Sequence, residues 1–189
     1  QTDEDLARIA RGVLTAETDL LPAGSSGLAR PWARELATLR GRQAHRHQPS
    51  ASDRPTLCVI GSVHPRSLEQ MEYAVAKGVV EEGDDSAGSR LLRVAIGATP
   101  DGWAEQLRNT VASGSFGSLV LSGGSTAGLV FDALGVDAFD IGGSTTAGAP
   151  WGTIQARIGE GLTVVTKSGA FGDPDELARI VRSLHRGDV

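Results

Sequence analysis

The sequence lacks the features of a disulfide-rich or membrane-spanning protein. Its one cysteine, Cys58, cannot form an internal disulfide bond, and the apolar residues around it predict a buried side chain in preference to a reactive thiol. No secretory signal opens the chain, and no apolar run approaches the roughly 20 residues of a membrane span. These absences favour a cytoplasmic location.

The chain also lacks an excess of positive charge. It has 18 Lys and Arg residues and 23 Asp and Glu residues, which give a net charge of −5. This balance argues against nonspecific binding to nucleic acid or to an anionic membrane. His45 and His47 lie two residues apart with no cysteine or carboxylate cluster nearby, so no metal site is predicted.

Three sequence motifs of well-known sites are missing. No glycine stands directly before Lys167, so the Lys-Ser pair there does not complete a P-loop. The chain has no G-x-G-x-x-G segment, which leaves a dinucleotide-binding Rossmann site unsupported. It has no G-x-S-x-G segment, the usual sign of a hydrolase nucleophile elbow.

The pattern of apolar residues divides the chain into three parts. Residues 1–41 are predicted to be helical, with Thr2 as a cap and acidic residues in the first turn. Residues 42–55 are polar, contain two prolines and show no periodicity, so we interpret them as a linker. Residues 56–189 are predicted to form an α/β domain.

Strands and helices alternate in this predicted domain with short loops between them, which indicates an α/β fold with a mainly parallel sheet and helices on both faces. The last helix is predicted to be capped by Asp173, with Glu176 completing a capping box. The predicted strands are 56–62, 91–97, 118–124, 137–143 and a pair at 151–159 and 162–169, and the predicted helices are 67–79, 102–114, 126–135 and 171–187, with a loop at 81–89.

Glycine with serine or threonine follows three of the predicted strands, at residues 60–65, 121–128 and 166–173. Glycine lets a ligand approach the backbone, and free N–H groups at a helix start bind anions. Three such turns at one sheet edge would form a cradle for a phosphate or a nucleotide. The alternative is plain turn chemistry.

Three residues near these turns could each have either a ligand-binding or a structural role. Lys167, at a strand end, could meet a phosphate or be solvated. His64 could contact a ligand or serve only the turn. Trp151 could stack on a base or pack in the core.

At residues 61–65, 122–136, 147–152 and 161–173 the sequence resembles the C-terminal nucleotide-binding domain of the four-carbon acid sugar kinase family, also called DUF1537. Residues 21–37 resemble the segment that closes the N-terminal domain of that family. The resemblance implies a kinase that uses ATP and Mg²⁺ to phosphorylate the terminal hydroxyl of a sugar acid such as threonate, erythronate or an oxo-tetronate.

Several site residues are carried over from the resemblance. It implies that Ser62 and His64 line the nucleotide, that Gly169 packs near it, and that Lys167 can add a charge. The turn implied to wrap the phosphates is Gly123, Gly124, Ser125, Thr126 and Ala127.

The Asp-Asp-x-Thr-Gly turn of the family's N-terminal domain does not occur in these 189 residues. We therefore expect a substrate-binding domain in cis or in trans, with a homo-oligomer as a further possibility, and we name no catalytic base. The alternatives are a non-catalytic module that binds nucleotides or small anions, and a structural or oligomerisation domain.

Overall fold

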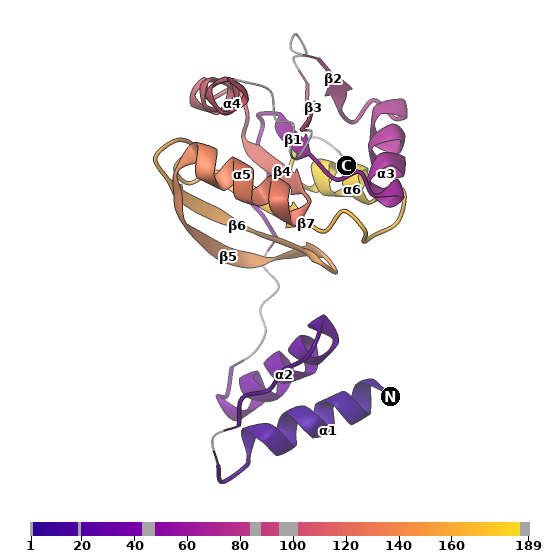
Figure 1. Cartoon of the computed structure of the whole chain (residues 1–189), viewed down its shortest axis with the longest axis vertical. Helices are drawn as coiled ribbons and strands as arrows, with labels where there is room; N and C mark the ends of the chain where they lie inside the picture. The colour runs from indigo at the N-terminus through magenta and orange to yellow at the C-terminus, as the bar shows by residue number, and fades with distance from the viewer. Residues whose placement is uncertain (1, 19, 43–47, 84–87, 95–101, 186–189) are drawn as a thin grey trace. The chain divides into compact units, whose positions relative to one another are not determined.

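The computed structural model describes residues 2–18, 20–42, 48–83, 88–94 and 102–185, and it divides into a unit of residues 1–46 and a unit of residues 47–189 (Figure 1). The first unit contains two helices, α1 (Asp3–Leu14) and α2 (Ser26–Leu39). Thr2 caps α1 as predicted, and Asp5 completes a reciprocal capping box with it. Arg11 of α1 donates two hydrogen bonds to the carboxylate of Glu35 in α2, at 2.9 and 2.8 Å.

The second unit is built around one seven-stranded sheet, which confirms the predicted α/β class. The strand order is β2-β3-β1-β4-β7-β6-β5, with β2, β3, β1, β4 and β7 parallel and with β6 and β5 antiparallel. The strands are β1 (Thr56–Ile60), β2 (Glu81–Glu82), β3 (Arg90–Arg93), β4 (Ser118–Ser122), β5 (Val136–Thr146), β6 (Ala149–Ala156) and β7 (Thr163–Lys167), and the helices are α3 (Pro65–Ala76), α4 (Trp103–Ala112), α5 (Gly124–Leu134) and α6 (Glu176–Ser183).

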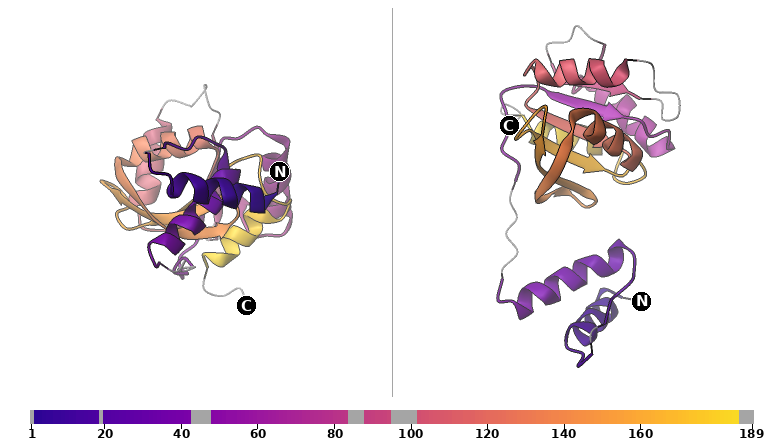
Figure 2. Two further views of the ribbon diagram at one scale, coloured as in Figure 1. Left: turned by 90° about the horizontal axis from the view of Figure 1, so that it is seen from below. Right: turned by 60° about the vertical axis from the view of Figure 1, so that its left-hand side comes forward.

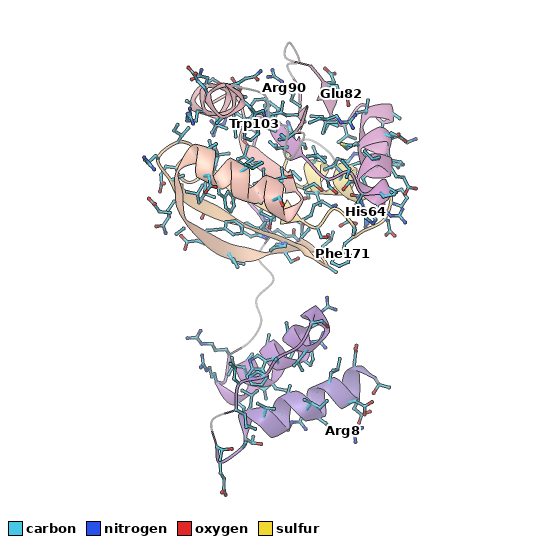
Figure 3. The ribbon with its side chains drawn as sticks, viewed as in Figure 1. Arg8, His64, Glu82, Arg90, Trp103 and Phe171 are labelled. Carbon is cyan, nitrogen blue, oxygen red and sulfur yellow. The ribbon has the colours of Figure 1, made fainter. Side chains whose placement is uncertain are left out.

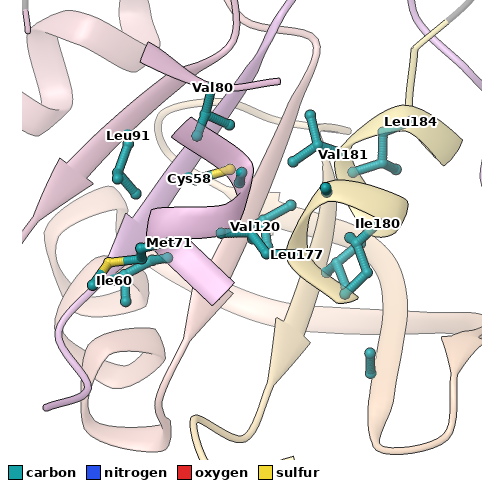
Figure 4. Packing of buried hydrophobic residues seen from close by; sticks show 14 residues of the cluster. Cys58, Ile60, Met71, Val80, Leu91, Val120, Leu177, Ile180, Val181 and Leu184 are labelled. Atoms are coloured by element: carbon teal, nitrogen blue, oxygen red, sulfur yellow. The ribbon is translucent and has the colours of Figure 1, made fainter. Parts of the chain in front are cut away.

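Helices cover both faces of the sheet because successive side chains of the central strands point to opposite sides. Cys58 and Ile60 of β1 pack with α3 and α6 in one apolar cluster, drawn in Figure 4. Leu57 and Val59 of the same strand pack with α4 and α5 in a second cluster. Both faces of β1 and β4 are thus buried, as expected for the centre of a parallel sheet (Figure 2).

Two local predictions were wrong. Residues 81–82, expected in a loop, form the short edge strand β2 beside β3. Helix α6 begins at Glu176, and no side chain among the described residues caps it. The carboxylate of Asp173, the predicted cap, faces Arg179 at 3.4 Å instead. The carboxylate of Glu176, predicted to complete a capping box, is held by Thr146 and Arg179. The predicted apolar stripe of this helix is buried as expected: Leu177, Ile180, Val181 and Leu184.

The segment interpreted as a linker lies partly on the α/β unit. Ser52 forms an isolated parallel bridge with His185, and its N–H donates to the carbonyl of Leu184 at 2.9 Å. Residues 43–47, with His45 and His47, lie outside the described part of the chain, and the linker role of residues 42–55 stays a prediction. No described helix is long and apolar enough to cross a membrane.

Candidate functional site

The three glycine-containing turns lie side by side at one edge of the sheet. They follow β1, β4 and β7, which are adjacent and parallel, and the strand ends are aligned, with Ile60 opposite Ser122 and Ser122 opposite Lys167. Each turn leads to a helix, α3, α5 or α6. In open α/β sheets this carboxyl edge is where ligands bind.

After β4, the turn at Gly123 leads into α5 and leaves the backbone N–H groups of the first helical turn uncapped. Gly123 has a φ of +108° and donates its N–H to the carbonyl of Lys167 at 2.9 Å, which ties this turn to β7. The helix that follows has no side-chain cap. Its first N–H groups have no carbonyl one turn earlier to accept them, and the helix dipole adds partial positive charge there. Gly124 is exposed, and a Cβ built on it would meet no atom within 4 Å.

Thr126, in the first turn of α5, carries a buried hydroxyl with no hydrogen-bond partner. Its side chain has no exposed area, and its Oγ1 lies 3.0 Å from a Cβ built on Gly123. An unpaired hydroxyl inside a protein is unfavourable by about 1–3 kcal/mol. Among the described residues, none supplies a partner for this hydroxyl.

Lys167 ends β7 at the same edge and is buried, with 6% of its surface exposed, so it is not the solvated lysine of one interpretation. Its Nζ donates to the carbonyl of Ser168 at 2.9 Å. Burial lowers the pKa of Lys167, and the carboxylate of Glu176 partly opposes that shift.

Two hollows meet at the start of α5. The smaller, about 330 Å³, lies between the turn after β1 and the turn after β4, and is lined by Gly61, Ser62, Val63, Gly123, Gly124 and Ser125. The larger, about 580 Å³, extends from α5 and β7 to the β5–β6 hairpin, and is lined by Gly123, Gly124, Ala127, Phe131, Phe139, Gly148, Pro150, Thr166, Lys167 and Ser168. Gly123 and Gly124 line both hollows, so one extended ligand could occupy the pair.

Ser62 and Gly169 join the first turn to the third. A Cβ on Gly169 would lie 2.1 Å from the Oγ of Ser62, and Ser67 donates its hydroxyl to the Gly169 carbonyl at 2.9 Å. Buried Gln70 of α3 also donates to the third turn, to the carbonyls of Phe171 and Asp173 at 3.1 and 2.8 Å. Helix α3 therefore fixes the shape of the third turn.

His64 and Trp151 have structural partners. His64 is exposed at the start of α3, where its Nδ1 accepts the N–H of Arg66 at 3.2 Å and caps the helix (Figure 3). Trp151 is half-buried, packs against the α3/α6 cluster, and its ring would lie 2.4 Å from a Cβ on Gly142. These positions match the turn and packing interpretations.

Several residues that line the larger hollow were not predicted from the sequence. Phe131 and Phe139 have ring centroids 5.9 Å apart and come from α5 and β5. Gly148 and Pro150 come from the hairpin. Apolar residues in a helix and a strand are typical of a core. The long-range pairing of β5 with β6 brings Phe139, Gly148 and Pro150 to the hollow that Phe131 of α5 also lines.

Comparison with known proteins gives matches to the domain that the sequence resembles. Residues 85–177 match the family described as nucleotide-binding C-terminal domain. A D-threonate kinase from Bordetella bronchiseptica is 28% identical over 205 residues, which cover 96% of this chain and 50% of that protein. A 3-oxo-tetronate kinase from Pectobacterium atrosepticum is 39% identical over 64 residues, 34% of this chain and 14% of that protein.

A solved structure shares the fold. A DUF1537 protein from Bordetella bronchiseptica, described as a domain-swapped dimer with bound citrate, has a TM-score of 0.59 and 26% identity, covering 98% of this chain and 51% of that one. The chain thus spans about half the length of the D-threonate kinase and of this structure. These findings confirm the resemblance: the chain fits the C-terminal nucleotide-binding domain of the four-carbon acid sugar kinase family.

Proposed function

We propose that the α/β unit binds ATP with Mg²⁺ and is the nucleotide-binding part of a kinase that phosphorylates a four-carbon sugar acid. The observation that carries the proposal is the start of α5, where an uncapped helix, an open Gly124 and the unpaired hydroxyl of Thr126 meet. A phosphate group supplies what this place lacks, because its oxygens accept hydrogen bonds from N–H and hydroxyl donors and carry negative charge.

The two hollows suggest how ATP would lie. Its phosphates would occupy the smaller hollow against the N–H groups of Gly124–Thr126, with the hydroxyls of Ser62 and Ser125 beside them. Lys167, which lines the larger hollow, would add positive charge there. The nucleoside would extend along Ala127 toward Phe131 and Phe139, which offer apolar surface. His64 and Gly169 would support the first and third turns.

Mg²⁺ would be bound mainly by the nucleotide. Within the described ranges, no group of three or more His, Cys, Asp and Glu residues could hold a metal ion. Mg²⁺ commonly keeps several waters and binds the phosphates of a nucleotide with one or two protein ligands. When bound, it would neutralise phosphate charge during phosphoryl transfer.

The acid sugar would be held by a second domain, in cis or in trans. The D-threonate kinase relative is about twice as long as the matched region, which leaves room for such a domain in that protein. Phosphoryl transfer depends on holding donor and acceptor in line, which is worth roughly 7–11 kcal/mol as effective concentration. We therefore expect the 189-residue chain alone to release no ADP in response to threonate or erythronate.

A thermal-shift titration tests the nucleotide part of the proposal. The folded chain is heated with ATP, ADP or adenosine, each with and without Mg²⁺. A ligand at about 100 times its dissociation constant adds about 2.7 kcal/mol of stability. We expect a rise in Tm with ATP and ADP and a much smaller one with adenosine. No rise at millimolar ATP would refute the proposal, and an equal rise with inorganic phosphate would favour a general anion-binding module.

A further inference from the structure

Glu176 is a buried carboxylate that the proposed function does not use. It is the first residue of α6, and 4% of its surface is exposed. Charged side chains are rarely buried unless they are paired, because removal from water disfavours the charge. Its partners therefore indicate what it does.

One oxygen of Glu176 reaches the β5–β6 hairpin. Its Oε1 accepts a hydrogen bond from the hydroxyl of Thr146, the last residue of β5. Within the hairpin, Ser144 and Thr145 donate their hydroxyls to the carbonyl of Ala149 at 3.2 and 3.1 Å. The hairpin then contributes Gly148 and Pro150 to the wall of the larger hollow. Glu176 thus ties that wall to α6.

The second carboxylate oxygen of Glu176 pairs with a positively charged side chain. Its Oε2 accepts from Arg179, which also faces Asp173 and Asp175 at 3.4 and 3.3 Å. The Glu176 carboxylate also acts on Lys167 and raises its pKa against the effect of burial.

We propose that Glu176 is a positioning residue of the nucleotide site, which holds the hairpin wall of the larger hollow in place through Thr146. The inference rests on the proposed function, since a fixed wall serves a nucleotide in that hollow.

Three variants separate the hydrogen bond between Glu176 and Thr146 from the charge of Glu176. Glu176→Gln removes the charge and keeps an oxygen for Thr146. Thr146→Val removes the hydroxyl and keeps the charge. Asp175→Asn is the matched control, because it neutralises a neighbouring carboxylate that pairs with Arg179 and not with Thr146. Urea unfolding of each variant shows which ones remain folded.

The first measurement needs no nucleotide. Hydrogen exchange is measured at the hairpin amides of each folded variant. We expect faster exchange at the hairpin in Thr146→Val and an unchanged rate in Asp175→Asn. Unchanged hairpin exchange in Thr146→Val would overturn the inference.

The second measurement is the Kd for Mg-ADP by calorimetry. Thr146→Val should weaken binding about threefold, the size of one hydrogen bond. Glu176→Gln should weaken it less, because its amide oxygen still accepts from Thr146, and Asp175→Asn should bind like the unmodified protein. Unmodified affinity in Thr146→Val would overturn the inference. Absence of binding by the unmodified protein would instead refute the proposed function, while the first measurement still tests Glu176. Should Glu176→Gln fail to fold, Thr146→Val still decides whether the tie to the hairpin supports binding.

Discussion

Replacing Gly124 by valine tests whether a ligand approaches the backbone at the start of α5. A Cβ at this position would meet no protein atom within 4 Å, and Gly124 is not among the glycines with positive φ. The folded chain therefore has room for a Cβ at this position. A phosphate approaching the N–H groups of the first helical turn would not have that room.

The expected effects on folding and on binding differ strongly in size. Valine and glycine differ in helix propensity by only a few tenths of a kcal/mol, so the free energy of unfolding should change by less than about 0.5 kcal/mol. Hydrogen bonds to a charged group are worth about 1.5–3 kcal/mol each. Loss of one or more of them would weaken nucleotide binding roughly 10- to 100-fold.

The assay pairs urea unfolding with calorimetric titration of Mg-ATP on the same preparations. Gly128→Val is the matched control, because Gly128 lies one turn further along α5 and a Cβ there also meets no atom within 4 Å. We expect the control to bind normally. The reasoning fails if Gly124→Val binds nucleotide as well as the unmodified chain, or if it loses stability in proportion to affinity.

Other substitutions probe the packing and charge around the site. Gly169→Ala should lower the free energy of unfolding by about 1–3 kcal/mol, because its Cβ would lie 2.6 Å from the Cβ of Ser62; an unchanged urea midpoint would contradict this. Burial lowers the pKa of Lys167, so the unfolded chain binds that proton more tightly and stability should rise with pH from the lowered pKa toward 10.5. Lys167→Met should abolish this rise and weaken nucleotide binding. If the stability of Lys167→Met depends on pH between 7 and 10.5 in the same way as that of the unmodified protein, the lowered pKa of Lys167 is wrong. Burial raises the pKa of the Cys58 thiol to about 12, so folded protein should not react with a thiol reagent at pH 8, and rapid labelling would place Cys58 at the surface.

The alternation of predicted strands and helices predicted most of the fold, because most elements are long enough for their apolar residues to show the spacing of a strand or of a helix. The strands at 56–60 and 118–122 are buried on both faces, and their continuous apolar runs indicated a parallel sheet. The edge strand β2 has two residues, both glutamate, and it pairs with β3. No local pattern predicts a strand of that kind.

The candidate site was only partly accessible from the sequence. Glycine and hydroxyl residues after three strands indicated the cradle, since their chemistry is local. The burial of Lys167 and its relation to Glu176 depend on how α6 packs against β7 and the hairpin, which no local pattern encodes. The same packing explains why Glu176, expected to complete a capping box, instead binds Thr146 and Arg179.

The central claim is that phosphate oxygens bind the N–H groups at the start of α5, and the most direct test is amide NMR of ¹⁵N-labelled chain titrated with Mg-ADP. We predict that the largest shifts occur at the amides of Gly124, Ser125 and Thr126. Smaller shifts should follow at Ser62 and Ala127. Saturable binding that leaves the amides of residues 123–127 unmoved, or no binding at millimolar Mg-ADP, would contradict the account.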